Sequence, residues 1–139
     1  MVGPASEEEG AVEKSCTFVS AGANARVPLL MVCLRKGYGL GAQAMAGGSF
    51  ATTAFTISWP TGEYGTMGLE GGVKLGYKRE LEAESDAASR QARYEELVRQ
   101  AYEVGSALSV ASLMEIDAVI DPKDTRQWIT HTLNTIPPV

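Results

Sequence analysis

The 139-residue sequence contains one histidine, two cysteines and no apolar run longer than eight residues. A run of eight is far too short to cross a bilayer as a helix, so no membrane span is expected. The first nine residues have neither a basic nor an apolar segment, so no signal peptide is visible and a cytoplasmic protein is predicted. Cys16 and Cys33 lack CxxC spacing and have apolar neighbours, which predicts two buried, reduced thiols.

Basic residues are also few. Twelve basic against 17 acidic residues give a net charge of −5, and the absence of a basic run argues against nucleic acid as a partner. The single His131 lies in the last predicted helix and is expected to be a surface or packing residue. No His/Cys cluster has metal-ligand spacing, so no metal is expected. The absence of G-x-S-x-G excludes a nucleophile elbow.

Glycine is plentiful, and it is concentrated in residues 35–48, Arg-Lys-Gly-Tyr-Gly-Leu-Gly-Ala-Gln-Ala-Met-Ala-Gly-Gly. Residues 27–34, just before, form an apolar run typical of a strand buried on both faces, and residues 42–45 are good helix formers. A strand, a glycine-rich turn and a short helix leave backbone N–H groups free at the helix N-terminus. Glycine has no Cβ, so a ligand can approach the main chain closely at Gly37, Gly39 and Gly41.

This stretch therefore predicts a site that stabilises negative charge, because backbone N–H groups can form an oxyanion hole without any titratable side chain. Two other interpretations stay open. Residues 37–42 fit the dinucleotide fingerprint G-x-G-x-x-A of a nucleotide-binding α/β domain, with Glu63 near the position of the ribose-binding acid. Against it, Gly47 and Gly48 interrupt the helix before a parallel crossover of about a dozen residues is complete. The glycines can also form a tight turn without a ligand.

The remaining pattern alternates helices and strands, which predicts an α/β layer structure. Helices are expected over residues 7–22, 69–81 and 86–108, and in a last helix that opens with Asp121 as its N-cap. Strands are expected over residues 50–59 and 114–120, with a turn-rich loop at 60–68. Three glycines within one predicted helix suggest close packing against another backbone, including one in another subunit: Gly71, Gly72 and Gly76.

Four segments in sequence order resemble the carboxyltransferase subunits of biotin-dependent acyl-CoA carboxylases. They are residues 27–48, Trp-Pro-Thr-Gly-Glu at 59–63, Met-Gly-Leu-Glu-Gly at 67–71 and Ile-Asp-Ala-Val-Ile-Asp-Pro-Lys-Asp-Thr-Arg at 116–126. That family has two crotonase-like domains in tandem, and residues 1–139 are similar only to the last part of the second. The resemblance implies a partial C-terminal carboxyltransferase domain with an α/β fold, a crotonase-like spiral of ββα units.

The resemblance also implies a mechanism. Carboxybiotin on a carrier protein releases CO2, and backbone N–H groups stabilise the biotin enolate. The biotin ring nitrogen takes the α-proton of the acyl-CoA, whose enolate attacks CO2. The family match at residues 39–42 makes the N–H groups of Leu40 and Gly41 the expected donors to biotin, and Gln43 matches a pocket position linked to acyl-chain choice. The Trp-Pro-Thr-Gly loop that contains Glu63 is expected to give structural support rather than chemistry. The other expected substrate-binding residues are Tyr38, Gly39 and Ala42.

The family's active site lies between the first domain of one subunit and the second domain of another, and the oxyanion hole for the acyl-CoA belongs to the first domain. The resemblance therefore implies that this chain needs other carboxyltransferase subunits or the missing half of its own chain. A biotin carboxyl carrier or biotin carboxylase subunit is a further expected partner, and the chain alone is expected to be inactive. Alternatively, the chain is a non-catalytic assembly module that makes subunit contacts through residues 68–76 and the apolar face of 94–108.

Overall fold

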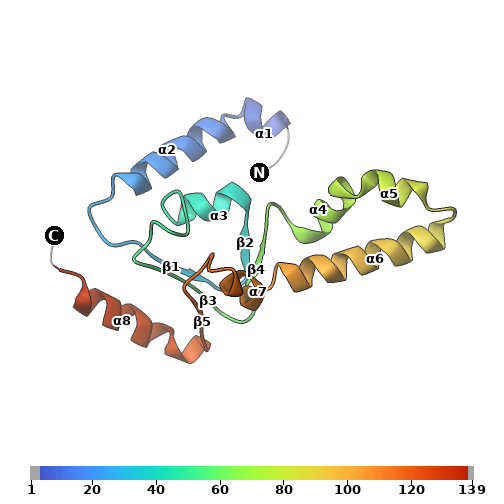
Figure 1. The fold of residues 1–139 in the computed structure, drawn as a ribbon. Helices are drawn as coiled ribbons and strands as arrows, with labels where there is room; N and C mark the ends of the chain where they lie inside the picture. Colours follow the sequence, from blue (N-terminus) through green and yellow to red (C-terminus); the bar gives the residue numbers. More distant parts are fainter. Residues whose placement is uncertain (1–3, 138–139) are drawn as a thin grey trace.

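The computed structural model describes residues 4–137, in which two small parallel sheets lie among helices (Figure 1). One sheet has the strand order β1 (Leu30–Cys33), β3 (Phe55–Ser58), β5 (Ala118–Val119). The other consists of β2 (Lys36–Tyr38) and β4 (Glu63–Gly65). Every strand pair is parallel, so each pair is joined by a crossover rather than by a hairpin.

Two successive ββα units build these sheets. The first contains β1, β2 and α3 (Gly39–Met45), and the second contains β3, β4 and α4 (Leu69–Gly76). The first strands of the two units pair with each other, Leu30 opposite Phe55, and so do the second strands, Lys36 opposite Glu63. This repeat confirms the predicted α/β fold of ββα units.

The core is centred on β3, whose four side chains are all buried. On one side, Phe55, Ile57 and Ile120 pack with α8 (Thr125–Thr135), where the rings of Phe55 and Trp128 meet edge to face at 5.9 Å. A second cluster contains Cys33, Tyr64, Ala107 and Ile116 and includes the start of α7 (Ala107–Ser112). Together the two clusters fix both sheets to the helices that follow them in sequence.

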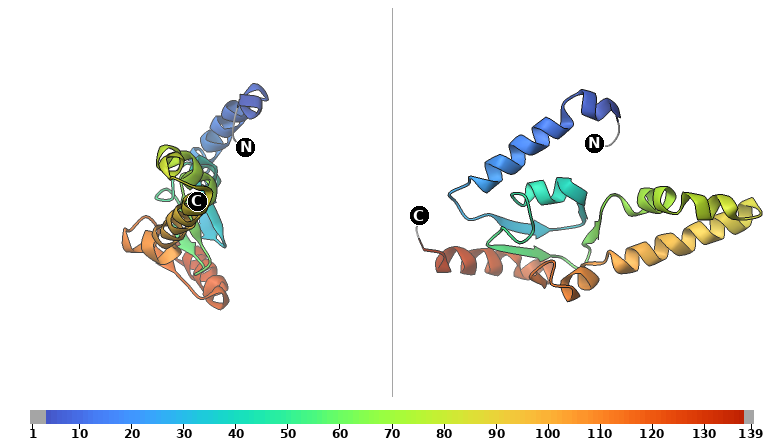
Figure 2. Two further views of the ribbon diagram at one scale, coloured as in Figure 1. Left: turned by 90° about the vertical axis from the view of Figure 1, so that its right-hand side faces the viewer. Right: turned by 45° about the horizontal axis from the view of Figure 1, so that its top comes forward.

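Residues 69–104 form an arm that extends away from the sheets (Figures 1 and 2). It consists of α4, α5 (Lys78–Ala83) and the long α6 (Ala87–Val104), which returns alongside the first two. The arm has a small core of its own, Val73, Leu81 and Leu97. Tyr94, Val98 and Ala101 of α6 pack against this core, which confirms this part of the apolar face predicted over residues 94–108, whereas Leu108 lies outside α6 and is 70% exposed.

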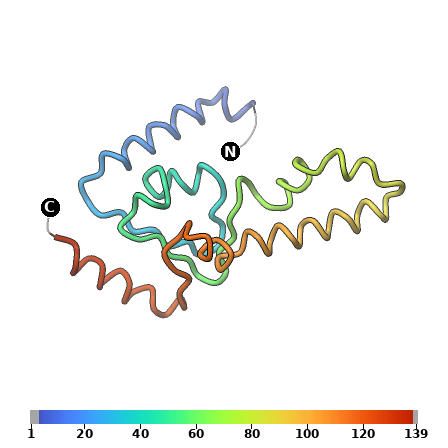
Figure 3. The backbone as a smooth tube through the Cα atoms, viewed as in Figure 1, coloured from blue at the N-terminus to red at the C-terminus, as the bar shows by residue number. Residues whose placement is uncertain are grey.

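Two helices at the start of the chain, α1 (Pro4–Glu8) and α2 (Ala11–Ala23), run above α3 (Figure 3). The contact between α2 and α3 is so close that a Cβ at Gly22 would lie 2.5 Å from the Cα of Gly47. A 3-10 turn (η1, Pro122–Asp124) precedes α8 and begins, as predicted, with Asp121 as its N-cap. Across residues 4–137, no helix combines the length and the apolar character that crossing a membrane requires.

Several predicted helix boundaries are wrong for local reasons. The helix expected over residues 7–22 is divided at Gly10, which adopts φ 77°. The helix expected over 69–81 is divided at Tyr77, and the one expected over 86–108 ends at Gly105. At Gly105 the carbonyl accepts a hydrogen bond from the Tyr64 N–H over 2.7 Å, and the Tyr64 carbonyl leaves no room for a Cβ. A strand distant in sequence therefore ends this helix.

The strands also differ from their predicted lengths. Residues 50–54 turn rather than extend, because the hydroxyls of Thr52 and Thr53 bind nearby carbonyls. Residues 114–117 are not in a strand, and β2 and β4 were not predicted. The segment 27–34 contains only the four-residue β1, of which Cys33 alone is buried, whereas Val27 is 66% exposed. The predicted strand buried on both faces is therefore wrong.

Two further expectations about packing do not hold within this chain. Cys33 is buried as predicted, but Cys16 is exposed, because no residue of α2 is buried by the rest of residues 4–137. A Cβ at Gly71 or Gly76 would meet no described atom within 4 Å, so the predicted close backbone packing is not made here. Packing of these glycines against another subunit stays a prediction.

Candidate functional site

The glycine-rich stretch is a direct junction between a strand and a helix. Tyr38 is the last residue of β2, and Gly39 is the first residue of α3. Gly39 adopts φ 57°, and a Cβ there would lie 2.5 Å from the carbonyl oxygen of Thr66. Both the left-handed backbone and the contact require glycine at this position. The chain thus turns into α3 within two residues.

This junction leaves the two predicted N–H donors free of intrahelical bonds. Leu40 and Gly41 lie in the first turn of α3, where no helical carbonyl lies four residues earlier. The side chain of Leu40 is 80% exposed, and a Cβ at Gly41 would meet no described atom within 4 Å. Gly37, by contrast, packs its backbone against the ring of Tyr64 and the thiol of Cys33. Of the three glycines, only Gly41 has open space where a Cβ would lie.

A cavity of about 700 Å³ lies beside this junction. From the junction and α3, Gly39, Leu40 and Gln43 line it, whereas Tyr38, Gly41 and Ala42 do not. Most of the other lining residues are apolar, and half of them come from β4, α4, α6 and α7, among them Tyr64, Leu69, Val73, Ala101 and Val110. The cavity can therefore take an apolar group next to the first turn of α3.

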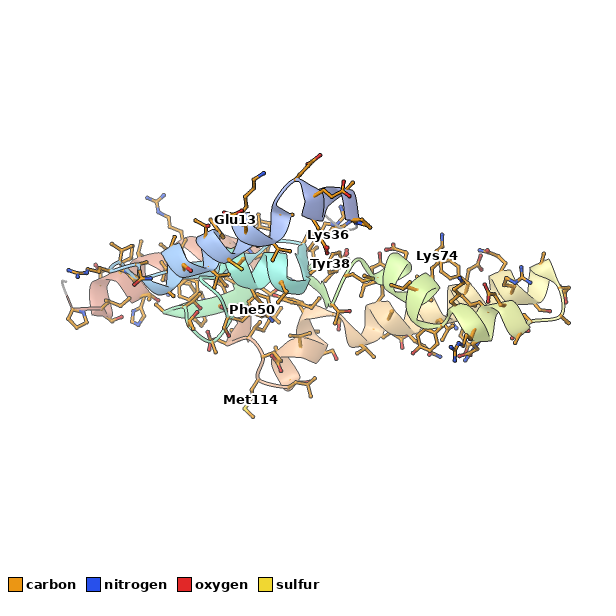
Figure 4. The ribbon with its side chains drawn as sticks, turned by 90° about the horizontal axis from the view of Figure 1, so that it is seen from above. Glu13, Lys36, Tyr38, Phe50, Lys74 and Met114 are labelled. Atoms are coloured by element: carbon orange, nitrogen blue, oxygen red, sulfur yellow. The ribbon has the colours of Figure 1, made fainter. Side chains whose placement is uncertain are left out.

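The side chain of Tyr38 belongs to a polar cluster outside this cavity. Its hydroxyl donates to Oε2 of Glu63 over 2.6 Å, and Nε of Arg35 lies 3.5 Å from Oε1 of the same carboxylate. Burial, together with the hydrogen bond to Glu63, raises the pKa of the Tyr38 hydroxyl, which therefore stays protonated at neutral pH. Figure 4 shows Tyr38 beside Lys36, between α3 and the arm. Glu63 thus binds the end of β2 next to the junction, and it lies in β4 rather than in the predicted loop.

A second tyrosine–carboxylate pair lies in the arm. The hydroxyl of Tyr102 on α6 donates to Oε1 of Glu70 on α4 over 2.5 Å. This hydrogen bond raises the pKa of Tyr102 to about 12 and lowers the pKa of Glu70. This pair was not predicted from the sequence, because the two residues are 32 positions apart and no local pattern joins them. The pair fixes α4 against α6.

The strand topology agrees with the dinucleotide interpretation better than expected, but the backbone geometry of the junction does not. β1 and β3 are parallel neighbours, and the connection between them contains α3, so the objection from crossover length is wrong. In a dinucleotide-binding turn, however, the second glycine lets the backbone approach the pyrophosphate. Here that glycine, Gly39, faces the carbonyl of Thr66 instead. The junction therefore lacks the open backbone that a pyrophosphate needs.

The titratable side chains that line the cavity are those of Tyr64, Tyr77 and Glu115, and no described histidine, cysteine or lysine lines it. His131 is exposed on α8 and does not line the cavity. Within residues 4–137, no group of three or more His, Cys, Asp or Glu side chains is arranged to hold a metal ion. What the junction offers is hydrogen-bond donation from backbone N–H groups next to an apolar cavity.

Comparison of the sequence with known protein families gives a match to the carboxyl transferase domain family over residues 1–136. The propionyl-CoA carboxylase carboxyltransferase subunit of Haloferax mediterranei is 33% identical over 130 residues, 94% of this chain and 25% of that subunit. A solved single-chain, multi-domain long-chain acyl-CoA carboxylase is 51% identical, with a TM-score of 0.81 over 95% of this chain and 13% of that one.

A crystal structure of transcarboxylase 12S, a hexamer with methylmalonyl-coenzyme A bound, has a TM-score of 0.83. It is 26% identical and matches 100% of this chain and 27% of its own. The chain spans about a quarter of the length of the curated relatives it matches.

Proposed function

Because the chain belongs to the carboxyl transferase domain family, we propose that it supplies one side of an active site that moves CO2 from carboxybiotin to the α carbon of an acyl-CoA. Residues 1–139 would then be the last part of a second carboxyltransferase domain. The observation that carries this proposal is the junction of β2 and α3, where the N–H groups of Leu40 and Gly41 are free of intrahelical bonds and Leu40 lines an apolar cavity.

In this proposal the chain acts through its backbone. Biotin, when bound, would supply the carboxyl group on a partner carrier protein. The N–H groups of Leu40 and Gly41 would stabilise the negative charge that develops during transfer, because donors fixed in place before the reaction need no reorganisation. The open space beside Gly41 supports the fit of a ring close to the main chain. A backbone donor does not depend on its side chain, so leucine at position 40 is compatible with this role.

The cavity beside the junction supports acyl binding in the same site. Its walls are mainly apolar, as a hydrocarbon group requires, and Gln43 adds a polar group from α3. We assign the acyl group to this cavity, with Gln43 contributing to the choice of acyl chain. Two structural relatives support an acyl-CoA substrate, since one is a long-chain acyl-CoA carboxylase and the other binds methylmalonyl-coenzyme A.

Exposed apolar residues at the rim of the cavity support the need for partners. Leu40, Val104 and Leu113 line the cavity and are at least 68% exposed. Other carboxyltransferase subunits, or the missing half of a longer chain, would cover them and supply the other oxyanion hole. A biotin carboxyl carrier or biotin carboxylase subunit would deliver the carboxyl group. The 139-residue chain alone is therefore proposed to be inactive.

A second proposal, a non-catalytic assembly module, is favoured by the surface of the arm. Leu75 on α4 and Tyr77, which directly follows α4, are exposed. A Cβ at Gly71 or Gly76 of the same helix would meet open space. In this proposal the arm would contact a neighbouring subunit, and no chemistry would depend on the junction.

A chimera separates the two proposals. Residues 1–136 would replace the matching segment of the single-chain long-chain acyl-CoA carboxylase, with the parent enzyme and a segment deletion as controls. We expect the chimera to incorporate labelled bicarbonate into acyl-CoA, and the deletion to be inactive. A folded, assembled but inactive chimera would favour the assembly module. Turnover of an acyl-CoA with free biotin by the 139-residue chain alone would contradict its proposed incompleteness.

A further inference from the structure

Glu63 holds the strand that leads into α3 at both ends. Tyr38, the last residue of β2, donates its hydroxyl to Oε2 over 2.6 Å, and Arg35, just before β2, lies 3.5 Å from Oε1. Glu63 itself opens β4, the strand paired with β2. One carboxylate therefore fixes β2 against β4 through side chains as well as through the backbone.

The contact with Tyr38 also fixes the start of α3. Tyr38 is the residue immediately before the helix and has an extended backbone, φ −99° and ψ 131°. Gly39 follows in the left-handed region, with Thr66 against one side of it. Since Leu40 and Gly41 come directly after this bend, the direction of their N–H groups depends on where Tyr38 is held.

Of the two contacts to Glu63, the one with Tyr38 is the stronger. The Arg35 side chain is 69% exposed, and an exposed ion pair at 3.5 Å contributes little. The Glu63 side chain is only 18% exposed, and the short hydrogen bond it accepts is charge-assisted. Tyr38 is therefore the residue through which Glu63 acts on the junction.

We propose that Glu63 is a positioning residue: through Tyr38, it orients the Leu40 and Gly41 N–H groups although it does not line the cavity. The effect of Glu63 on the orientation of these N–H groups can be measured in this chain alone. The effect on carboxyl transfer rests on the proposed function. The two parts are tested by different measurements.

The arm provides a matched control. Tyr102 and Glu70 form the same kind of tyrosine–carboxylate hydrogen bond, but they join α6 to α4. Tyr102→Phe therefore removes the same chemical group as Tyr38→Phe without removing a hydrogen bond of the junction. Glu63→Gln keeps an acceptor oxygen for the Tyr38 hydroxyl, whereas Glu63→Ala removes it.

Amide hydrogen exchange in the 139-residue chain tests the geometric part. The reporters are the amides of α3 that are bonded within the helix, including Ala46, whose N–H donates to the Ala42 carbonyl over 3.1 Å. We expect Tyr38→Phe and Glu63→Ala to raise their exchange rates about fivefold, as the loss of one hydrogen bond predicts. Tyr102→Phe and Glu63→Gln should leave these rates close to wild type.

Unchanged exchange in α3 of the Tyr38→Phe and Glu63→Ala chains would overturn the proposal. An equal rise in the amides of β3 would also overturn it, because the substitutions would then lower global stability rather than loosen the junction.

Steady-state kinetics of the chimera tests the catalytic part. We expect Tyr38→Phe and Glu63→Ala each to lower kcat about tenfold without changing the KM for acyl-CoA, and the double variant to lose no more than either single one. Tyr102→Phe should keep the parent kcat. A chimera without activity would contradict the proposed function, while the exchange result would still decide the positioning role. Faster exchange in α3 with an unchanged kcat would show that the junction does not act in transfer.

Discussion

Gly39 and Thr66 are in backbone contact: a Cβ at position 39 would lie 2.5 Å from the Thr66 carbonyl oxygen, and φ at Gly39 is 57°. We expect Gly39→Ala to lower the free energy of unfolding by about 2 kcal/mol or more, because strain and the clash add. Urea unfolding of the 139-residue chain measures this effect.

The matched control is Gly41→Ala, two residues further along. A Cβ there has open space, and alanine is a better helix former, so the variant should be about 0.5–1 kcal/mol more stable than wild type. Equal stability of the Gly39→Ala and Gly41→Ala chains would contradict the described conformation of the junction.

Gly41→Pro tests the role of one backbone donor, since proline has no N–H. Removal of an oxyanion-hole donor typically costs about 10²–10³ in rate, and we expect a loss of that size in the chimera. Gly41→Ala keeps the N–H, so this variant of the chimera should lose far less activity. Proline also disfavours helical backbone at Leu40, so unfolding is measured in parallel. Full activity of a folded Gly41→Pro chimera would exclude this N–H as a donor.

Tyr64→Phe should stabilise the chain. The Tyr64 hydroxyl is buried and makes no hydrogen bond of normal geometry within residues 4–137, although Cys33 and Ser58 lie near it, and burial raises its pKa. Removing an unpartnered buried hydroxyl should raise the free energy of unfolding by about 1 kcal/mol. Tyr38→Phe is the matched comparison and should lower it, because that hydroxyl has a partner. A less stable Tyr64→Phe chain would show that its hydroxyl is satisfied in solution.

The start of α6 should make stability depend on acid pH. Asp86 accepts hydrogen bonds from the N–H groups of Ala88 and Ser89, which lowers its pKa from the ordinary 3.8 to about 2. A carboxyl with a lowered pKa stabilises the fold above its unfolded pKa and loses this effect as the pH falls through its folded pKa. This contribution should therefore be complete above about pH 4 and fade toward pH 2.

Melting temperatures of three chains measure the effect. Asp86→Ala removes the cap and should melt a few degrees below wild type at pH 6, with a difference that shrinks toward pH 2. Asp86→Asn can accept the same hydrogen bonds without a charge, so its cap should not titrate. A difference between wild type and Asp86→Ala that is constant from pH 6 to pH 2 would rule out a charged cap.

Elements that rest on local signals could be predicted from the sequence. Asp121 and Asp86 each mark a helix start, the apolar face that begins at Tyr94 packs against the neighbouring helices, and the order of elements indicated α/β layers. The family resemblance added the ββα repeat. It also led to the junction at Leu40 and Gly41, where the first turn of α3 begins.

Features that depend on distant contacts could not be predicted. β2 and β4 are short and rich in glycine, and only their pairing makes them strands. Gly105 ends a helix because Tyr64 binds it, and Glu63 belongs to the site because Tyr38 reaches it across 25 positions. Cys16 has helical spacing with apolar neighbours, but spacing does not show whether another segment covers that face of α2.

The arm of residues 69–104 has a consequence for cooperativity. Its buried side chains, Val73, Leu81 and Leu97, form a cluster separate from the two clusters at the sheets. The free energy that closes α4 and α5 on α6 is therefore largely independent of the free energy that pairs β1 with β3, and such units open separately. A partner that binds the arm can thus stabilise or destabilise its helix packing while the strands of the sheets keep their register.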